Sequence, residues 1–201
     1  MCGGATVWSP FASYNIKPTD RVGIIGIGGL GHMAIQFASK VGCEVIAFSG
    51  SESKRKEAFG FGATEFYATN NLKDFSGIKK LNHLLITTAN QPDFKLYSPS
   101  YIYKLISSWI PLMAANGTIF PLTVDFGETP IPILPLIVQG INVQGSASAS
   151  KGQLLKMLKF VVQHNIRPTI MKFPLTRDGV EEALKTLSEG NMRYRGVLVA
   201  A

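Results

Sequence analysis

The chain has 201 residues, of which 46% are hydrophobic and 16% charged, and this balance excludes a disordered protein while allowing one or two domains. Its two cysteines are too few for a disulfide scaffold or a cysteine-rich zinc cluster, so we expect a reducing compartment. The net charge of +7 suits a nucleic acid or a small polyanion. No long basic tract interleaved with aromatic residues occurs, and we therefore predict no nucleic-acid partner.

Membrane and export signals are weak in this sequence. The opening residues, MCGGATVWSP, lack the basic stretch followed by an apolar one that marks a signal peptide. The most apolar stretch runs from Val22 to Val41, but glycines, a histidine, a glutamine and a lysine interrupt it. We therefore expect a cytoplasmic protein with no membrane partner.

Apolar runs alternate with amphipathic stretches along most of the chain. This alternation predicts an α/β fold with a doubly wound parallel sheet, covered by helices. In chain order, the expected elements are a strand at Arg21–Ile25, a helix from about Gly29 to Val41, a strand at Glu44–Phe48, a helix at Ser51–Phe59, strands at Glu65–Tyr67, Leu84–Thr87, Gly117–Pro121 and Ile141–Gly145, helices at Lys151–His164 and Asp178–Ser188, and a strand at Gly196–Ala200.

Two segments fit this alternation poorly. Residues Asp93–Met113 hold two prolines and three tyrosines, and they read as an elaborated crossover or a lid. Further on, Pro130, Pro132 and Pro135 divide an apolar stretch. Because proline cannot donate to a sheet ladder, this stretch is expected to be an edge strand or a docking surface.

The first motif with chemical meaning is a glycine-rich turn, Gly26-Ile27-Gly28-Gly29-Leu30-Gly31. It follows a predicted strand directly and opens a predicted helix, as a dinucleotide site requires. Gly26 allows the tight turn, Gly28 lets the backbone approach a pyrophosphate, and Gly31 lets the helix pack closely on the strand. The helix N-terminus then faces the phosphates. The alternative is a glycine-rich turn without a ligand.

The end of the second strand decides which dinucleotide would bind. An Asp or Glu there would accept a hydrogen bond from the ribose 2′-hydroxyl of NAD. Here the strand runs into SGSESKRK, in which Ser49 and Ser51 offer hydroxyl donors and Lys54 a cation, as a 2′-phosphate requires. Two alternatives remain: Lys54 to Lys56 form a solvated helix face, or Glu52 serves the ribose in a shifted register.

Other catalytic signatures are absent from the sequence. No H-E-x-x-H, C-x-x-C or G-x-S-x-G occurs, so the usual signatures of metalloproteases, redox dithiols and hydrolases are missing. The three histidines, His32, His83 and His164, show no metal-ligand spacing. At the start of the phosphate-binding helix, His32 is interpreted as a structural or cofactor-edge residue.

Four stretches together carry a resemblance: MCGGATVWSP, KPTDRVGIIGIGGLGHMAIQFA, GFGATEF and the ending NMRYRGVLVA. In this order they resemble the medium-chain zinc-dependent alcohol dehydrogenases, in the cinnamyl-alcohol-dehydrogenase-like branch. The resemblance implies a Rossmann domain that binds NADP(H). For the full-length family it implies a catalytic zinc, hydride transfer between the nicotinamide and an alcohol or aldehyde carbon, and a homodimer.

The resemblance also assigns residues by position. Gly26, Gly28, Gly29, Leu30 and Gly31 would hold the pyrophosphate, and Ser49, Ser51 and Lys54 the 2′-phosphate. Near the nicotinamide half lie Thr88, Leu122, Ser146 and Ser148, while Arg195 reaches back toward the phosphates. Cys2 matches the last of the family's catalytic zinc ligands, but one cysteine cannot hold a catalytic zinc. No residue is assigned as catalytic.

The family's N-terminal catalytic domain has no counterpart in this sequence. We therefore expect a fragment of a full dehydrogenase or, alternatively, a stand-alone NADP(H)-binding module without catalysis. A zinc-free quinone reductase is disfavoured by Cys2 and the RYR ending. Residues 1–163 are predicted to form the NADP-binding domain and 164–201 to be a segment of the missing catalytic domain. Without that domain, the strands near Ile166–Phe173 and Gly196–Ala200 lack their usual partners, and self-association is expected.

Overall fold

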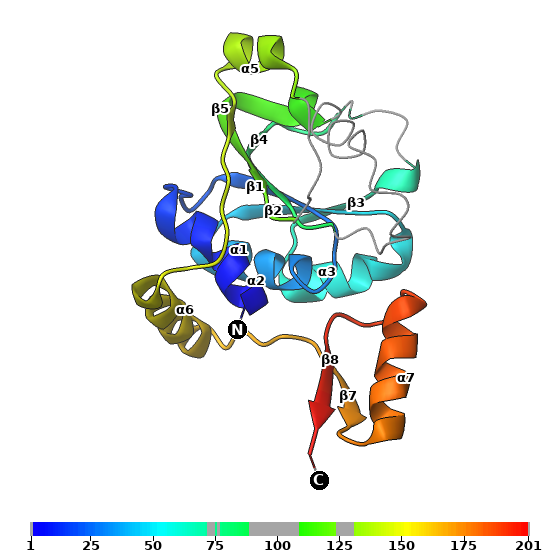
Figure 1. Ribbon diagram of the computed structural model, residues 1–201. Helices are drawn as coiled ribbons and strands as arrows, with labels where there is room; N and C mark the ends of the chain where they lie inside the picture. Colours follow the sequence, from blue (N-terminus) through cyan, green and yellow to red (C-terminus); the bar gives the residue numbers. More distant parts are fainter. Residues whose placement is uncertain (1, 72–74, 76, 89–108, 124–130, 201) are drawn as a thin grey trace.

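The computed structural model describes residues 2–71, 75, 77–88, 109–123 and 131–200 (Figure 1). Its centre is a six-stranded, fully parallel sheet in the order β3-β2-β1-β4-β5-β6. This confirms the predicted doubly wound sheet. The strands are β1 (Arg21–Ile25), β2 (Glu44–Ser49), β3 (Glu65–Ala68), β4 (Leu81–Ile86), β5 (Met113–Pro121) and β6 (Asn142–Val143).

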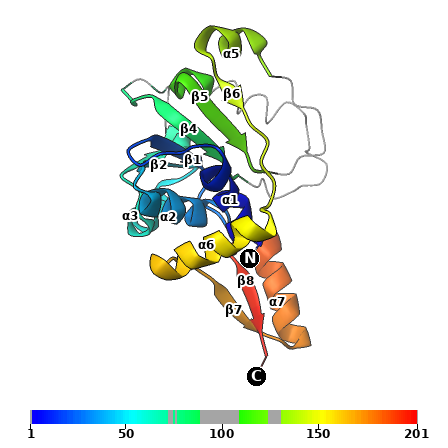
Figure 2. The ribbon, with the colours of Figure 1, turned by 90° about the vertical axis from the view of Figure 1, so that its left-hand side faces the viewer.

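Helices cover one face of the sheet, where α1 lies between the sheet and α6 (Figure 2). Their bounds are α1 (Cys2–Ser13), α2 (Gly31–Val41), α3 (Arg55–Phe61, after a 3-10 turn at Glu52–Lys54) and α6 (Lys151–Gln163). Trp8 of α1 packs on Phe37 and Phe160, with ring centroids 5.3 and 4.9 Å away. Helix α1 is not among the elements expected from the sequence, because glycine and proline lower its helix propensity and tertiary packing supplies its stability.

The opposite face of the sheet is covered by a second apolar cluster. Trp109, Ile110 and Leu112 are almost fully buried there, the last two in a 3-10 turn at Ile110–Leu112. The Trp109 ring meets Phe48 of β2 edge-on at 4.6 Å. Of the irregular segment expected at Asp93–Met113, residues 93–108 lie outside the described ranges, and Met113 begins β5.

The proline-containing stretch is a helix, α5 (Ile133–Gln139), so the edge strand expected there is wrong. Pro132 precedes the helix, and Pro135 lies in its first turn, where an amide N–H would have no intrahelical partner. Gly140, with φ at 65°, ends it in the left-handed region. The edge position belongs to the short strand β6 instead.

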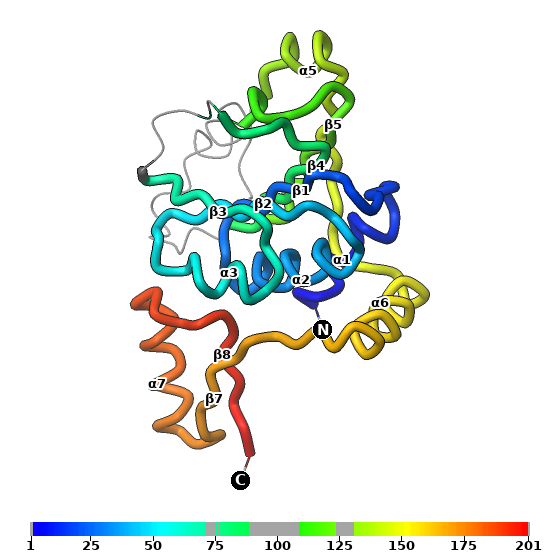
Figure 3. Tube along the Cα trace, turned by 180° about the vertical axis from the view of Figure 1, so that it is seen from behind, coloured from blue at the N-terminus to red at the C-terminus, as the bar shows by residue number. Residues whose placement is uncertain are grey.

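The C-terminal residues form a small unit of their own (Figure 3), built from β7 (Met171–Pro174), α7 (Arg177–Ser188) and β8 (Gly196–Val199). The two strands pair with each other in parallel and form a separate sheet. They are therefore not isolated, although each still has one edge without a strand beside it in the described part of the chain. Val197, Leu198 and Val199 are all about two-fifths exposed. Among the helices described, none is long and apolar enough to cross a lipid bilayer.

Candidate functional site

The glycine-rich turn lies where the winding of the sheet reverses, between β1 and its neighbour β4. Gly26 follows β1 with φ at +88°, a left-handed conformation that favours glycine. A Cβ on Gly26 would lie 2.7 Å from Thr88 Cγ2, and a Cβ on Gly31 would overlap the Gly26 carbonyl oxygen. Helix α2 thus starts in direct backbone contact with the end of β1, as predicted for the first and last glycines of the motif.

The middle of the turn is open. No atom in the described residues lies within 4 Å of a Cβ built on Gly28, so a ligand has room beside the backbone. Leu30 holds the N-cap position of α2, and neither a capping side chain nor an acidic residue in the first turn is present among the described residues. In contrast, Ser150 caps α6 and Thr176 caps α7. The N–H of His32 already donates to the Gly28 carbonyl and that of Met33 to the Leu30 carbonyl, so the N–H groups of the turn up to Gly31, the first residue of α2, are the ones available to an anion.

A threonine that the sequence analysis did not assign supports this turn. The hydroxyl of Thr87 lies 2.9 Å from the Ile25 carbonyl oxygen and 2.8 Å from that of Gly26, and Thr87 is only 4% exposed. Its N–H also donates to the Ile25 carbonyl at 3.0 Å. The sequence pattern predicts Thr87 only as the last residue of a strand. Its contact with Gly26 depends on the β1–β4 pairing, which no local pattern reveals.

The residues expected near the nicotinamide half gather at the carboxyl ends of neighbouring strands. Thr88 follows β4 and Leu122 follows β5, and the hydroxyl of Thr123 joins the two ends by donating to the Thr88 carbonyl at 2.7 Å. Ser146 follows β6, and its hydroxyl is buried without a hydrogen-bond partner among the described residues. Ser148 is exposed and left-handed, with φ at 56°, so it lies outside the enclosed part of this edge.

The residues expected to recognise a 2′-phosphate lie at the end of β2. Ser49 is the buried last residue of the strand, whereas the exposed hydroxyl of Ser51 lies 2.9 Å from that of Ser53. Glu52, the alternative ribose acceptor, binds Arg55 through both carboxylate oxygens at 2.6 and 2.8 Å. The hydrogen bond from Arg55 lowers the pKa of Glu52, so this carboxylate is ionised and already engaged.

Lys54 does not point into solvent, so the solvated helix face is wrong for this residue. Its Nζ donates to the carbonyl oxygen of Ile27, within the glycine-rich turn, at 2.7 Å and lies 5.5 Å from the centroid of the Tyr194 ring. Burial lowers the pKa of Lys54, and the nearby Arg193 guanidinium lowers it further. The next two residues of the run, Arg55 and Lys56, are exposed.

Arg195 reaches the same turn from the C-terminal unit. A Cβ on Gly29 would lie 2.9 Å from Arg195 Nε, and one on Gly3 would lie 2.6 Å from its terminal nitrogen. The guanidinium therefore lies between α1 and the glycine-rich turn. The structure thus brings Arg195, Lys54 and the turn together although they are far apart in sequence.

Cys2 stands apart from any metal centre. It is exposed at the start of α1 and has no disulfide partner among the described residues. Across those residues, no three His, Cys, Asp or Glu side chains come together as metal ligands. The described donor set therefore does not fit a zinc ion, and Cys2 stays a prediction as a single ligand.

Comparison with known proteins decides the family. Residues 29–163 match the family described as zinc-binding dehydrogenase. The chain belongs to this family. The aldehyde reductase AdhA of Synechocystis sp. is 33% identical over 98% of this chain and 55% of its own length. The NADP-dependent alcohol dehydrogenase C 1 of Mycolicibacterium smegmatis is 29% identical over 100% of this chain and 54% of its own length.

Solved structures agree with this zinc-binding dehydrogenase fold. A cinnamyl alcohol dehydrogenase from Sorghum bicolor superposes with a TM-score of 0.83 and 28% identity, over 98% of this chain and 53% of its own. CAD from Helicobacter pylori, complexed with NADP(H), gives a TM-score of 0.76 and 25% identity, over 98% and 52% of the two chains. The present chain spans about half the length of the relatives it matches.

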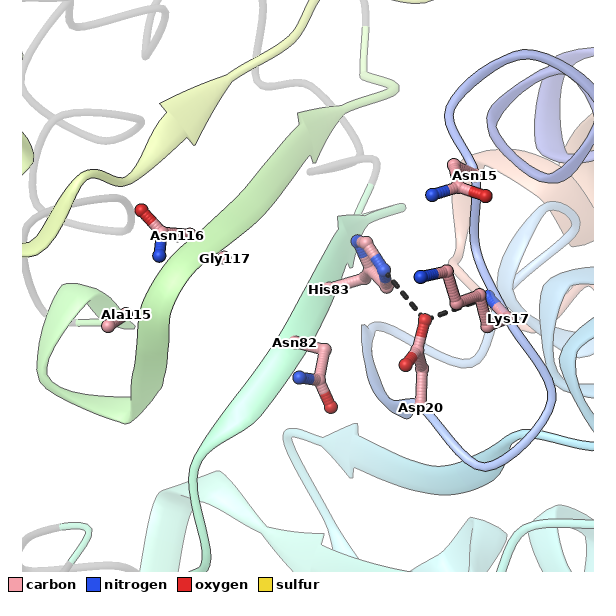
Figure 4. Close-up of a pocket in the computed structure, with 8 residues that line it drawn as sticks. All are labelled: Asn15, Lys17, Asp20, Asn82, His83, Ala115, Asn116 and Gly117. Carbon is pink, nitrogen blue, oxygen red and sulfur yellow. Dashed lines mark hydrogen bonds and ion pairs between the residues drawn. The ribbon is translucent and has the colours of Figure 1, made fainter.

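A polar pocket of about 250 Å³ lies at the opposite edge of the sheet, by the amino ends of β1 and β4 (Figure 4). Inside it, Asp20 Oδ2 accepts a hydrogen bond from the Lys17 N–H at 2.8 Å and lies 3.1 Å from His83 Nε2. Burial lowers the pKa of His83, outweighing the effect of the bond to Asp20. This pair joins β4 to the loop before β1 and lies away from the glycine-rich turn.

Proposed function

We propose that this zinc-binding dehydrogenase chain binds NADP(H) and is the cofactor-binding part of an alcohol dehydrogenase or aldehyde reductase. The observation that carries the proposal is the meeting of Lys54, Arg195 and the uncapped start of α2 around one open glycine-rich turn. Two cations and free N–H groups at one place suit a dinucleotide with several phosphates. The names of the relatives, among them an NADP-dependent alcohol dehydrogenase, support the same reaction class.

Each group then has a distinct role. The N–H groups of Gly28, Gly29, Leu30 and Gly31 bind the pyrophosphate, beside the open space at Gly28. The dinucleotide lies along the carboxyl ends of β4, β5 and β6, where Thr88, Leu122 and Ser146 contact its nicotinamide half and Ser148 lies at the exposed margin of the site. When bound, the nicotinamide accepts or gives the hydride that an alcohol or aldehyde carbon exchanges.

The phosphorylated cofactor is favoured over NAD by the residues after β2. A ribose 2′-hydroxyl needs a free carboxylate acceptor, but Glu52 is occupied by Arg55. Ser49 and Ser51 are small donors, and the Lys54 ammonium is held on the glycine-rich turn by the Ile27 carbonyl. We infer that these three residues bind the 2′-phosphate.

Calorimetric titration of the chain with NADPH and, separately, with NADH tests this proposal. We expect NADPH to bind about tenfold to 100-fold more tightly, because one or two charge-assisted hydrogen bonds to the 2′-phosphate are lost with NADH. Equal affinities would refute the 2′-phosphate site. Binding of neither nucleotide by a chain that is folded, as judged by circular dichroism, would refute the dinucleotide site itself.

A stand-alone NADP(H)-binding module is the second candidate, because no three His, Cys, Asp or Glu side chains of the described residues, Cys2 included, come together as metal ligands. An assay of primary-alcohol oxidation with NADP⁺ separates the two candidates. The reduced nicotinamide that forms is followed by its absorbance at about 340 nm. The division into residues 1–163 and 164–201 stays a proposal, with the β7–β8–α7 unit belonging to the catalytic part of a longer protein.

We also propose that two copies of the chain associate through α5 and the edge strand β6. Four apolar side chains of α5 are 61 to 73% exposed: Ile133, Leu134, Ile137 and Val138. An exposed apolar helix beside an unpaired sheet edge favours self-association. The double change Leu134→Lys with Val138→Lys is expected to convert dimers to monomers in light scattering.

The matched control for this experiment is Val162→Lys, because Val162 is an equally apolar residue, 82% exposed on α6. It is expected to leave the mass of the particle unchanged. A wild-type chain that stays monomeric at high concentration contradicts the proposed dimer.

A further inference from the structure

His32, the second residue of α2, is fully buried and has partners on both ring nitrogens. Its Nδ1 lies 2.9 Å from the Gly28 carbonyl oxygen, which can only accept. Its Nε2 lies 3.2 Å from the backbone nitrogen of Thr169, which can only donate. These two contacts together require a neutral imidazole with its proton on Nδ1.

The contact with Gly28 sets the direction of a neighbouring donor. The carbonyl oxygen of Gly28 and the N–H of Gly29 belong to one planar trans peptide, so they point in opposite directions. The backbone N–H of His32 also donates to this carbonyl, at 3.1 Å. With the carbonyl held toward α2 by two donors, the Gly29 N–H is turned away from α2.

The contact with Thr169 belongs to a longer connection between α2 and the C-terminal unit. One turn after His32, the Gln36 side chain donates to the Arg167 carbonyl at 3.0 Å and accepts from the Arg167 N–H at 3.3 Å. The ring of Tyr194 stacks on His32 at 4.7 Å, with an angle of 25° between the planes. His32 and Gln36 of α2 therefore bind the backbone of residues 167–169. His32 also contacts Tyr194, the residue before Arg195.

From this geometry we propose that His32 is a positioning residue for the cofactor: it fixes the Gly28 peptide so that the Gly29 N–H faces the phosphates, and it ties this turn to the segment at Thr169. The proposal rests on the proposed NADP(H) site. It assigns His32 no contact with the cofactor, because both of its ring nitrogens are engaged.

Protonation is expected to break the arrangement. A proton on His32 Nε2 would make this nitrogen a donor, facing the N–H of Thr169, which is also a donor. Burial lowers the pKa of His32, and the positive charges of Arg195 and Lys54, which face it from the C-terminal unit and from the turn before α3, lower it further. Tyr194 is the other titratable group packed on the ring. Since the folded pKa is lowered, the restraint is present at neutral pH and is lost as the pH falls through that pKa.

The test uses three variants of the whole chain and NADPH as the probe. His32→Asn keeps a donor for the Gly28 carbonyl, His32→Gln keeps an acceptor near the Thr169 N–H, and His32→Phe keeps only the stacking on Tyr194. We expect the Phe and Gln variants to bind NADPH about tenfold more weakly than the wild type, and the Asn variant to stay within about twofold. As the pH falls, the wild type should lose affinity for NADPH relative to the Asn variant. The titration of the cofactor phosphate affects both chains equally and therefore cancels in this comparison.

The proposal is overturned if the Phe variant binds NADPH as tightly as the wild type, or if the Gln variant keeps the affinity and the Asn variant loses it. It is also overturned if the affinities of the wild type and the Asn variant depend on pH in the same way. If the Phe variant unfolds, the comparison of Asn with Gln decides. Amide hydrogen exchange of residues 28–31 in the cofactor-free chain gives a reading that does not depend on NADPH. Faster amide exchange of these residues in the Gln variant than in the Asn variant supports the positioning role, even if the wild type binds no NADPH. The absence of NADPH binding would refute only the proposed function.

Discussion

Replacement of Gly31 by alanine is expected to destabilise the chain by about 3 kcal/mol and to abolish NADPH binding. The added Cβ would overlap the Gly26 carbonyl oxygen and lie 2.8 Å from Thr87 Oγ1 and 2.9 Å from the Gly26 carbonyl carbon. These obstacles are backbone atoms and a buried hydroxyl, which cannot move aside as a flexible side chain does. Helix α2 would have to leave the end of β1. Urea denaturation gives the free energy of unfolding, and calorimetry gives the affinity.

Gly28→Ala is the matched control for this change, three residues earlier in the same turn. Its Cβ meets nothing within 4 Å among the described residues, and φ at Gly28 is not positive. The free energy of unfolding should change by less than about 0.5 kcal/mol. NADPH binding should still weaken about tenfold, because the methyl group occupies the space left for the pyrophosphate. A Gly28→Ala chain that binds NADPH normally would place the nucleotide elsewhere.

Lys54→Met is expected to lower the affinity for NADPH about tenfold to 100-fold and to narrow the preference for NADPH over NADH by the same factor. The ammonium group is lost, whereas the aliphatic part of the side chain still packs near Tyr194. Loss of the bond to the Ile27 carbonyl affects both nucleotides alike, so the ratio of the two affinities isolates the 2′-phosphate. Calorimetry with each nucleotide measures it.

Lys56→Met provides the comparison, since it removes the same charge from an exposed position two residues further on. Its effect on the ratio should be small and should vanish with added salt, because a solvated charge acts only through a screened field. If Lys54→Met leaves the ratio as it is in the wild type, the 2′-phosphate is not bound by Lys54.

Much of the sheet could be predicted because its strands are short apolar runs with clear breaks. β1 has the predicted bounds, and β2 is longer by one residue. α2 begins at Gly31 rather than Gly29, because Gly28 to Leu30 are needed for the turn itself. β4 begins three residues earlier than expected, at Leu81. Asn82 and His83 interrupt its apolar pattern, but each has a partner near β1: Asn82 accepts from the Arg21 N–H, and His83 Nε2 lies 3.1 Å from Asp20 Oδ2.

What could not be predicted depends on contacts between distant segments. The glycine motif indicated the turn, but Thr87 supports it only through the β1–β4 pairing. The charge of Lys54 makes it a candidate for phosphate binding, but nothing in its neighbourhood along the chain places its amine on the Ile27 carbonyl. The helix α5 was missed because proline was read as a property of edge strands, although a first helical turn tolerates it equally well.

The packing of α1 on α6 has a consequence for the order of folding. Ser13 accepts a hydrogen bond from Gln153, 140 residues later, at 2.6 Å, and Tyr14 accepts one from Gln144 at 3.1 Å. During synthesis α1 is therefore made long before α6, and Trp8 can pack on Phe37 of α2 but not yet on Phe160. Contacts of such long range form late, because loop closure must precede them. Until α6 is made, the side of Trp8 that packs on Phe160 has no cover, so the packing of α1 is completed only late in folding.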